Sequence, residues 1–436
     1  MVKTLMILEK TIQRLELLHP KVIDLSLERL ERLLTKLDNP EKKLPPTVHV
    51  AGTNGKGSTI SILRSIQSAA GRSSHVYTSP HLVNLTERFL IADEEIKEST
   101  LVNLLKQCEE VNAESAITFF EIITAAGFLA FSKFEADLVL LEVGLGGRFD
   151  ATNVINNPIL SIITPISLDH QHYLGNTLPK IAFEKAGILK ENKPAVIGKQ
   201  YPEALEVIKL KAAETDSQLF IFDRDWSISE TKDSIKFEAD GDTRYFEKPS
   251  LRGTHQIQNS GIAIAAAHYL SKLFPIQNSA IDKGLKAVRW SARLQKIKRG
   301  PLAEILPNQV ELWVDGGHNH DASLAISETL HNLKRQDPSL TFHLIFGSLN
   351  NREVGSLLAP FLEIIDLIQT VAIPKHESTA SPENTANVAH SLGFDAAPSN
   401  SLLSAIEAII SKSKGKRIIL VYGSLYLAGS ILEKND

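Results

Sequence analysis

The sequence predicts an α/β protein with two domains, each built on a largely parallel sheet covered by helices. Short apolar runs alternate with helical patterns along the chain, as in sheets whose parallel strands are joined by helices. A glycine-rich loop stands between the first apolar run and the first long helix after it. With 436 residues, the chain is longer than one core of ordinary size accommodates, so two domains are expected.

The expected strands of the first domain are short and apolar, which is typical of strands buried between two layers of helices. The first strand, residues 48–51, leads into the glycine-rich loop. A helix is expected over residues 58–70, because Ile60, Leu63 and Ile66 form one apolar stripe. Further strands are expected at residues 75–78, 138–143, 159–164 and 194–198.

Residues 226–246 have a different pattern from the rest of the first domain. The segments SIKFEA and RYFEK alternate apolar and polar residues on either side of Asp240-Gly241. This pattern predicts a small antiparallel hairpin, which we expect at the edge of the parallel sheet.

A second α/β pattern begins after the basic, proline-bearing segment 296–301, and we place the domain boundary near residue 297. The first domain is therefore expected at residues 1–296 and a smaller, Rossmann-like α/β domain at residues 297–436. The expected strands and helices of the second domain lie at residues 310–314, 342–346, 367–373 and 417–422, and at residues 322–333 and 402–412.

Composition excludes several classes of protein. The net charge of -4 offers no broad basic surface for a nucleic acid backbone. The single cysteine, Cys108, allows no intramolecular disulfide, which fits a reducing compartment. The chain starts without the apolar stretch of a signal peptide and has no run of about 20 apolar residues to span a bilayer. We expect a cytoplasmic protein with no nucleic acid or membrane partner.

The glycine-rich loop predicts a nucleotide phosphate site, and hence a P-loop ATPase domain. Between a strand and a helix, the backbone N–H groups and the helix dipole converge on an anion, and Lys56 adds a positive charge. The spacing differs from the common GxxxxGK[ST] pattern, so a glycine-rich turn with an incidental lysine is the alternative. The residues expected to contact ATP here are Gly52, Thr53, Asn54, Gly55, Lys56, Gly57, Ser58 and Thr59.

Glu142 is a candidate ligand of Mg²⁺, because it ends an apolar strand in LVLLEVGLGGRFDATN. Ligands of parallel sheets bind beyond the carboxyl ends of the strands, and Mg²⁺ prefers oxygen ligands. A strand-end carboxylate facing solvent is the alternative. His170, in SLDHQHYLG, and Ser79, in YTSPHL, would by themselves be a hydrogen-bonded histidine and an ordinary turn serine.

Together these motifs resemble the folylpolyglutamate synthase and dihydrofolate synthase family, a branch of the Mur ligase superfamily, in its bacterial bifunctional form. The resembling segments follow the family's order over almost the whole chain. They are HPKVIDLSLERL, HVAGTNGKGST, VYTSPHLVNLTER, TFFE, LLEVGLGGRFDATN, SLDHQHYLG, FEKAGI, VDGGHNHDA and YGSLYLAG.

The resemblance implies roles for individual residues. Ser79, Glu142 and His170 match the family's Mg²⁺ ligands. Lys185 matches a lysine that is carbamylated in the family, and its carboxylate-like group would help to bind a second Mg²⁺. The positions that match nucleotide contacts are Asn259, Arg293 and Asp315, and His318 lies in the same loop, where it either orients or deprotonates the amine or is a structural histidine.

The resemblance also implies that ATP activates a substrate carboxylate as an acyl phosphate, which the amine of L-glutamate then attacks. The carboxylate would be dihydropteroate, a folate glutamate or both, and we favour both activities in a monomeric enzyme. The resemblance places the pterin side of the pocket at Asp24, Thr118, Phe119 and Phe120, and further substrate contacts at Arg148, Phe149 and Asp150. Aromatic faces suit a flat ring, although Phe119 and Phe120 are also typical of a core.

Two segments depart from the family pattern. The usual DxAHN loop is DGGHN here, with His320 where proline is common. In FGSLNNRE, the sequence Asn351-Arg352-Glu353 replaces an aspartate-lysine-aspartate cluster, which leaves the role of that loop open.

Three other classes remain alternatives. A Mur-type cell-wall ligase would share the loop, Glu142 and His170, but would lack the IDLSLER and TSPHL segments. A small-GTPase-like switch needs a guanine-reading NKxD segment, whereas this chain has NKP at residues 192–194 without the aspartate. A non-catalytic binding module would be expected to have lost a metal ligand or Lys185, and all are present.

Overall fold

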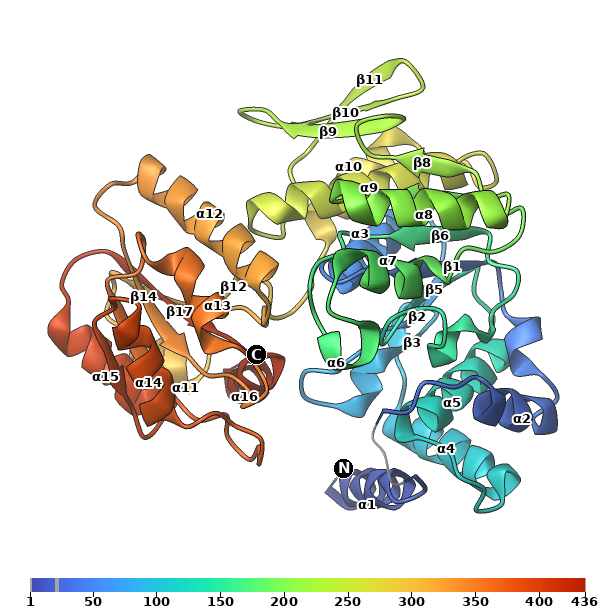
Figure 1. Ribbon diagram of the computed structural model, residues 1–436, viewed down its shortest axis with the longest axis horizontal. Coiled ribbons are helices and arrows are strands. Elements are labelled where there is room, and N and C mark those ends of the chain that lie inside the picture. Colours follow the sequence, from blue (N-terminus) through green and yellow to red (C-terminus); the bar gives the residue numbers. More distant parts are fainter. Residues whose placement is uncertain (1, 20–22, 436) are drawn as a thin grey trace. The chain divides into compact units, whose positions relative to one another are not determined.

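The computed structural model describes residues 2–19 and 23–435, which form two compact units (Figure 1). The first unit comprises Met1–Ser250 and Ile257–Val288, and the second comprises Leu251–Gln256 and Arg289–Asp436. Among the described helices, none is long and apolar enough to cross a membrane.

The first unit is built on an eight-stranded sheet with the order β4-β3-β2-β5-β1-β6-β7-β8. Its parallel strands are β1 (Thr47–Ala51), β2 (Ser74–Tyr77), β5 (Leu138–Glu142), β6 (Leu160–Ile163), β7 (Ala195–Ile197) and β8 (Leu219–Ile221). At one edge, β3 (Phe89–Ile91) and β4 (Glu94–Glu95) run antiparallel. The five strands predicted from apolar runs are confirmed, whereas β3, β4 and β8 were not predicted.

Helices cover this sheet and form two main cores. One core joins α1 (Val2–Glu16), α2 (Glu28–Lys36), α4 (Glu98–Asn112) and α5 (Phe119–Lys133) to residues of β2 and β5. The other joins α7 (Leu178–Ala186) and α8 (Pro202–Glu214) to β6, β7 and β8. The remaining helices of this unit are α3 (Lys56–Ala69), α6 (Gln171–Leu174), α9 (Thr254–Leu270) and α10 (Asn278–Ala287).

The predicted hairpin is present beside the edge strand β8, but it does not pair with the parallel sheet. It consists of β10 (Ile235–Ala239) and β11 (Asp242–Phe246), joined by Asp240 and Gly241 in the left-handed conformation that such turns require. A third strand, β9 (Trp226–Glu230), pairs with β10 and completes a separate three-stranded sheet. Its apolar side chains pack on α9 at Gly261, so packing on a helix replaces pairing with the parallel sheet.

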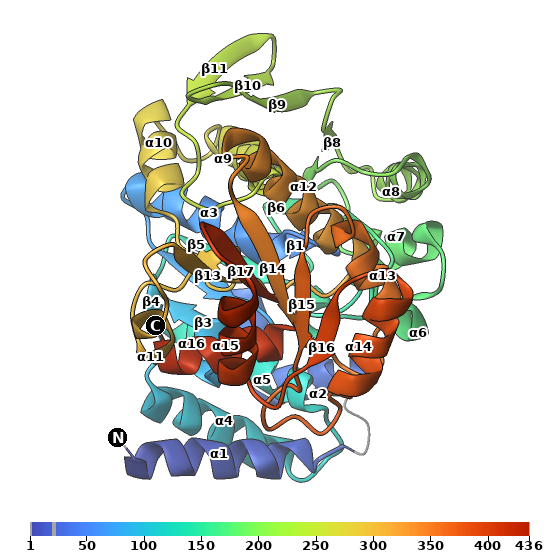
Figure 2. The ribbon, with the colours of Figure 1, turned by 90° about the vertical axis from the view of Figure 1, so that its left-hand side faces the viewer.

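The second unit contains a six-stranded sheet with the order β12-β13-β17-β14-β15-β16 (Figure 2). Among the described strands of this sheet, the pair formed by β12 (Gln295–Lys296) and β13 is the only antiparallel one. The parallel strands are β13 (Val310–Val314), β14 (Thr341–Phe346), β15 (Leu367–Thr370), β16 (Ala396–Pro398) and β17 (Arg417–Tyr422). All four strands predicted for this region are therefore present.

The helices of the second unit pack on this sheet. Helices α12 (His320–Gln336), α13 (Val354–Leu358) and α14 (Pro382–Ser391) share a core with Phe342, Leu344 and Leu420. Helix α15 (Leu402–Lys412) contacts β14 and β15, and α16 (Leu425–Asn435) contacts β17. A short helix, α11 (Pro301–Glu304), precedes β13. The α/β fold class predicted from the sequence is confirmed in both units.

Candidate active site

The glycine-rich loop follows β1 and is fastened to the segment after β6. The backbone N–H groups of Thr53 and Asn54 both donate to the carbonyl oxygen of Pro165, at 2.9 and 3.2 Å. The Thr53 hydroxyl donates to the carbonyl oxygen of Ser167, and the amide of Asn54 to the Ser167 hydroxyl. The segment that follows β6 therefore holds the glycine-rich loop in a fixed shape.

Two glycines of the loop are required by sterics. At Gly52 (φ 148°) a Cβ would lie 1.9 Å from the Thr164 hydroxyl oxygen. At Gly55 (φ 85°) it would lie 2.3 Å from Oδ1 of Asn259, so this predicted nucleotide contact lies beside the loop. Helix α3 begins directly after Gly55, two residues earlier than predicted.

Lys56 and the two hydroxyl residues of the loop are close to where phosphate would bind. The Lys56 ammonium donates to the carbonyl oxygens of Gly52 and Thr53, at 3.2 and 3.4 Å. Ser58 and Thr59 are buried in the first turn of α3, and the Thr59 hydroxyl has no hydrogen-bond partner among the described residues. Helix N-terminal N–H groups together with this lysine make an anion site.

Glu142 and Ser79 lie together next to the loop. Glu142 ends β5 and is 4% exposed, with its Oε1 3.9 Å from Nζ of Lys56. The backbone N–H of Ser79 donates to Oε2 of Glu142 at 3.3 Å. The hydroxyl of Ser79 is buried and has no hydrogen-bond partner in the described parts of the chain. An orphaned hydroxyl oxygen beside a carboxylate fits the oxygen ligands that Mg²⁺ prefers.

His170 follows β6, as predicted, and its backbone has a left-handed conformation at the start of α6. Its side chain is 41% exposed, and its Nε2 lies 3.9 Å from Oδ2 of Asp169. Within residues 2–19 and 23–435, no three His, Cys, Asp or Glu side chains form a preassembled metal cluster. A metal here would depend on the Ser79 hydroxyl in addition to Glu142.

Lys185 is the predicted site residue with the most unusual environment. It lies in α7, is 5% exposed, and its ammonium donates to the carbonyl oxygen of Gly52 at 2.9 Å. Burial, and then the charge of Lys56, lower the pKa of Lys185 to about 7, although Asp169 and Asp150 act in the opposite direction. The fold thus brings a lysine with a substantially neutral amine to the glycine-rich loop, 133 residues away in sequence.

Close backbone packing fixes α7 against the loop that follows β5. The N–H of Arg148 donates to the carbonyl oxygen of Glu184 at 2.7 Å, and the Arg148 guanidinium forms an ion pair with the Glu184 carboxylate at 2.8 Å. A Cβ at Gly147 would lie 2.7 Å from the carbonyl oxygen of Glu184 and 3.0 Å from that of Lys185. Glycine at this position therefore permits the placement of Lys185.

Substitution Gly147→Ala is expected to destabilise the first unit by about 1–3 kcal/mol, because the added methyl meets backbone that cannot rotate away. It should also lower turnover, since α7 carries Lys185. Urea unfolding and a turnover assay would measure both effects. The control is Gly355→Ala, where the nearest atom to a Cβ is 3.9 Å away. Equal stability and activity of the two variants would contradict the steric argument.

The predicted pterin-side residues are joined by two residues that were not predicted. Arg29 donates to Oδ2 of Asp24 at 2.9 Å and to both carboxylate oxygens of Glu121. Glu121 in turn accepts from the N–H of Thr118, which completes a capping box at the start of α5. The T-x-x-E spacing in TFFE is a signal that could have identified Glu121.

The aromatic residues of this region differ in exposure. Phe119 and Phe120 are both partly buried, and a Cβ at Gly144 would lie 2.4 Å from the Phe120 ring. Phe149 is 39% exposed, and the guanidinium of Arg148 lies over its ring at 4.3 Å and over the ring of Phe183 at 4.9 Å. The structure therefore places Phe120 beneath the loop after β5, while Phe149 is open to solvent.

Three predicted site residues belong to the second unit. Asp315, just after β13, is 3% exposed and accepts from the N–H groups of Leu294 and Gly317, at 2.9 and 2.7 Å. Arg293 donates to the carbonyl oxygen of Ala292 at 2.8 Å. A ring nitrogen of His318 lies 3.0 Å from the carbonyl oxygen of Gly316. Asp315 thereby organises the loop that carries His318.

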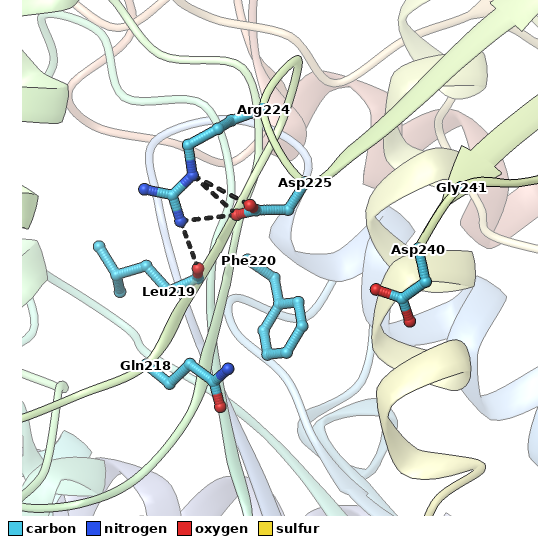
Figure 3. A pocket seen from close by; sticks show the side chains of 7 residues that line it. All are labelled: Gln218, Leu219, Phe220, Arg224, Asp225, Asp240 and Gly241. Carbon is cyan, nitrogen blue, oxygen red and sulfur yellow. Dashed lines mark hydrogen bonds and ion pairs between the residues drawn. The ribbon is translucent and has the colours of Figure 1, made fainter.

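A pocket elsewhere in the first unit contains none of the predicted site residues (Figure 3). It lies between β8 and the hairpin turn, and Phe220, Arg224 and Asp240 contribute to its lining. The Arg224 guanidinium is already bonded to Asp225 and to the carbonyl oxygen of Leu219. The charge of Arg224 is therefore already paired, whereas the predicted site residues of the first unit lie at the glycine-rich loop and the segments around it.

Comparison with known proteins defines the class of this fold and site. The family description "Mur ligase middle domain" matches residues 50–267, which include the glycine-rich loop, Glu142 and Lys185. The description "Dihydrofolate synthetase, C-terminal domain" matches residues 298–434. The protein is therefore an ATP-dependent ligase of the Mur type.

Similar proteins specify the family. The dihydrofolate synthase/folylpolyglutamate synthase of Bacillus subtilis is 34% identical over 431 residues, covering 94% of each chain. The structure of Escherichia coli FolC in complex with DHPP and ADP has a TM-score of 0.86 at 29% identity, covering 98% of this chain and 97% of that one. A bifunctional folylpolyglutamate synthase/dihydrofolate synthase with Mn, AMPPNP and L-glutamate bound has a TM-score of 0.82 at 29% identity, covering 98% and 97%. The chain belongs to the dihydrofolate synthase/folylpolyglutamate synthase family, which confirms the predicted resemblance.

Proposed function

We propose that this protein uses ATP to ligate L-glutamate both to 7,8-dihydropteroate and to folate glutamates. The observation that carries the proposal is the convergence of Lys56, Glu142 and Lys185 on one phosphate-binding loop. A single lysine in the loop would suit many nucleotide-binding proteins. The additional carboxylate and the buried lysine suit a reaction in which several negative charges meet.

The reaction has two steps. A carboxylate oxygen of the substrate attacks the γ-phosphorus of ATP, so that an acyl phosphate forms and ADP leaves. The amine of L-glutamate then attacks the acyl carbon, the amide bond forms, and phosphate and a proton are released. Lys56 and the N–H groups at the start of α3 would stabilise the charge that builds up on the phosphoryl oxygens.

Mg²⁺ would be held by Ser79, Glu142 and His170, and when bound it would neutralise phosphate charge. The orphaned hydroxyl of Ser79 beside Glu142 supports this assignment. We propose a second ion at carbamylated Lys185. Its neutral amine would bond to the carbon of CO₂ and release one proton, leaving an anionic oxygen donor. The lowered pKa, about 7, supports this modification because only the neutral amine reacts.

The carboxylate substrate is proposed to bind along the loop after β5. Phe119, Phe120 and Phe149 would provide aromatic contacts for the pterin ring, and Asp24 and Thr118 polar ones, fixed through Arg29 and Glu121. Arg148 supplies a positive charge for the negatively charged substrate. The E. coli relative was solved with DHPP and ADP, which supports a shared substrate class.

We also propose roles for four further motif residues, of which Asn259 lies in the first unit and the other three in the second. Asn259, Arg293 and Asp315 would contact the nucleotide, and His318 would orient or deprotonate the attacking amine. We propose domains at residues 1–296 and 297–436, with the second binding glutamate. A cytoplasmic monomer fits the single cysteine, Cys108, whose thiol is buried and has its pKa raised by burial to about 12.

The decisive experiment measures ADP release with dihydropteroate, and separately with tetrahydrofolate, each with and without glutamate. Glutamate-dependent release with both substrates is the expected result. Release with one substrate alone would restrict the protein to a single activity. A response only to UDP-linked muropeptide acceptors would assign it to cell-wall synthesis, and no glutamate-dependent release with either folate would refute the proposal.

A further inference from the structure

A chain of buried polar side chains runs from the middle of β1 to the loop after β5. His49, in the central strand β1, has a ring nitrogen, Nε2, 2.8 Å from the hydroxyl oxygen of Thr152. The Thr152 hydroxyl lies 2.5 Å from Oδ1 of Asp150. His49 and Thr152 are 0% exposed and Asp150 is 2% exposed. The sequence motifs single out Asp150 but give no role to the other two residues.

The direction of these hydrogen bonds follows from the number of protons available. Thr152 has one hydroxyl proton, which it donates to the Asp150 carboxylate. Its oxygen must therefore accept at the other contact, so His49 is the donor through Nε2–H. Nδ1 is buried and has no partner among the described residues, so a proton there would be a donor without an acceptor, and the ring is neutral with Nδ1 unprotonated. Burial, with a smaller effect of the Lys190 charge, lowers the pKa of His49 to about 3, which agrees with a neutral ring.

Asp150 connects these hydrogen-bonded side chains to the loop after β5 and anchors it. Oδ1 also accepts from the N–H of Thr152 at 3.0 Å, and Oδ2 accepts from the N–H of Leu145 at 2.8 Å. The nearly inaccessible carboxylate of Asp150 accepts hydrogen bonds from N–H groups of the loop. It therefore holds the residues immediately after Glu142 in place.

The anchored loop borders three parts of the proposed site. It starts two residues after Glu142, and Gly144 lies against the ring of Phe120. It continues to Gly147, whose backbone lies against that of Glu184 and Lys185 in α7. A shift of this loop would displace the metal candidate, the aromatic contact and the buried lysine together.

We propose that His49 and Thr152 are positioning residues, which act through Asp150 to hold residues 144–147 in the conformation that the ligase reaction needs. This inference rests on the proposed function for its kinetic consequences, although the anchoring itself can be measured without turnover. His49 sets the orientation of the Thr152 hydroxyl, and that hydroxyl leaves the other carboxylate oxygen available to the loop. Neither residue touches substrate in this arrangement.

The test compares Thr152→Val, which keeps the shape of the side chain and removes the hydroxyl, with Thr152→Ser, which keeps the hydroxyl. His49→Leu removes the donor at the other end of the chain, and a double variant combines His49→Leu with Thr152→Val. Thr370→Val is the matched control, because Thr370 is also 0% exposed and loses a hydrogen bond, to the carbonyl oxygen of Pro382 in the second unit. Each protein is assayed for kcat, for KM of ATP, and for hydrogen exchange of residues 143–150.

Thr152→Val and His49→Leu are each expected to lower kcat by about 10- to 100-fold, with little change in the KM for ATP, because misplacement acts on the reacting geometry. Their effects should not multiply in the double variant, since both break one chain. Exchange of residues 143–150 should accelerate in both. Thr152→Ser should stay close to the wild type, and Thr370→Val should change neither kcat nor this exchange.

The inference is overturned if Thr152→Val matches the wild type in kcat and in exchange, if Thr152→Ser is as impaired as Thr152→Val, or if the two single effects multiply. If Thr152→Val does not fold, kcat and the hydrogen exchange of residues 143–150 are compared between His49→Leu and the wild type instead. Equal values would overturn the inference. A wild-type protein without glutamate-dependent ADP release would refute the proposed function instead, and the exchange comparison would still decide whether the anchor exists.

Discussion

Replacement of Lys185 by alanine is expected to lower glutamate-dependent turnover by about 100-fold or more, comparable to the loss of one preorganised charge-stabilising group. The Lys185 side chain is 5% exposed, with its Nζ 2.9 Å from the carbonyl oxygen of Gly52, so its loss removes the proposed carbamate from the glycine-rich loop. A small carboxylate such as formate, added in excess, should restore part of the activity if the lysine acts as a carbamate. Steady-state ADP release with and without formate measures both effects.

Lys190→Ala is the matched control for this experiment. Lys190 is also a largely buried lysine, with its pKa lowered by burial to about 8, but its ammonium donates to the carbonyl oxygen of Asn153. Its variant should show no recovery with formate. The absence of recovery in Lys185→Ala as well would contradict the carbamate.

The carbamate also predicts a pH dependence. With a pKa of about 7, the amine of Lys185 is protonated below this pH and becomes neutral as the pH rises through it. CO₂-depleted protein should therefore regain activity faster at pH 8 than at pH 6 when the concentration of dissolved CO₂ is the same in both samples and both are assayed at one common pH. Equal rates of recovery at the two pH values would argue against reaction at this amine.

Substitution Glu142→Gln is expected to lower kcat/KM on the order of 100-fold, because metal-ion charge stabilisation contributes several kcal/mol and the amide is a weaker ligand. The variant keeps the size of the side chain and an acceptor for the N–H of Ser79. Raising the Mg²⁺ concentration should recover part of the loss. Titration of turnover with Mg²⁺ distinguishes weakened metal binding from misfolding.

Asp137→Asn serves as the control at the opposite end of the same strand. Asp137 precedes β5 and accepts from the backbone N–H of Ser73 at 2.8 Å, far along the strand from Glu142. Its variant should have the wild-type Mg²⁺ dependence. If Glu142→Gln shows the wild-type dependence too, Glu142 is not a metal ligand.

The buried strands were predictable because their residues are almost all apolar, and strands covered on both faces have this composition. Strand β4 escaped prediction because it consists of two exposed glutamates. The hairpin could be located from its Asp-Gly turn, but the separate three-stranded sheet that it joins could not be predicted. That sheet depends on a third strand and on the packing of Trp226 and Ile228 against Gly261, which no local pattern encodes.

The residues of the candidate site were predictable where they stand in motifs with a fixed local geometry. The glycine-rich loop and the strand-end Glu142 are of this kind. The pair Arg29–Glu121 and the pair His49–Thr152 were not predicted, because their partners lie 92 and 103 residues apart. Such pairs depend on how the strands and helices are ordered in the fold, and a sequence read locally does not contain this information.

The second unit is not one continuous stretch of the chain, since residues 251–256 belong to it and precede the return of α9 to the first unit. Within this short segment, the Arg252 guanidinium lies 4.6 Å from the Trp313 ring, and the Thr254 hydroxyl donates to Glu328 at 3.1 Å. A single genetic crossover near residue 297 would therefore transfer the second unit without these partners. A chimera joined there would keep both contacts only if its two parents share these four residues.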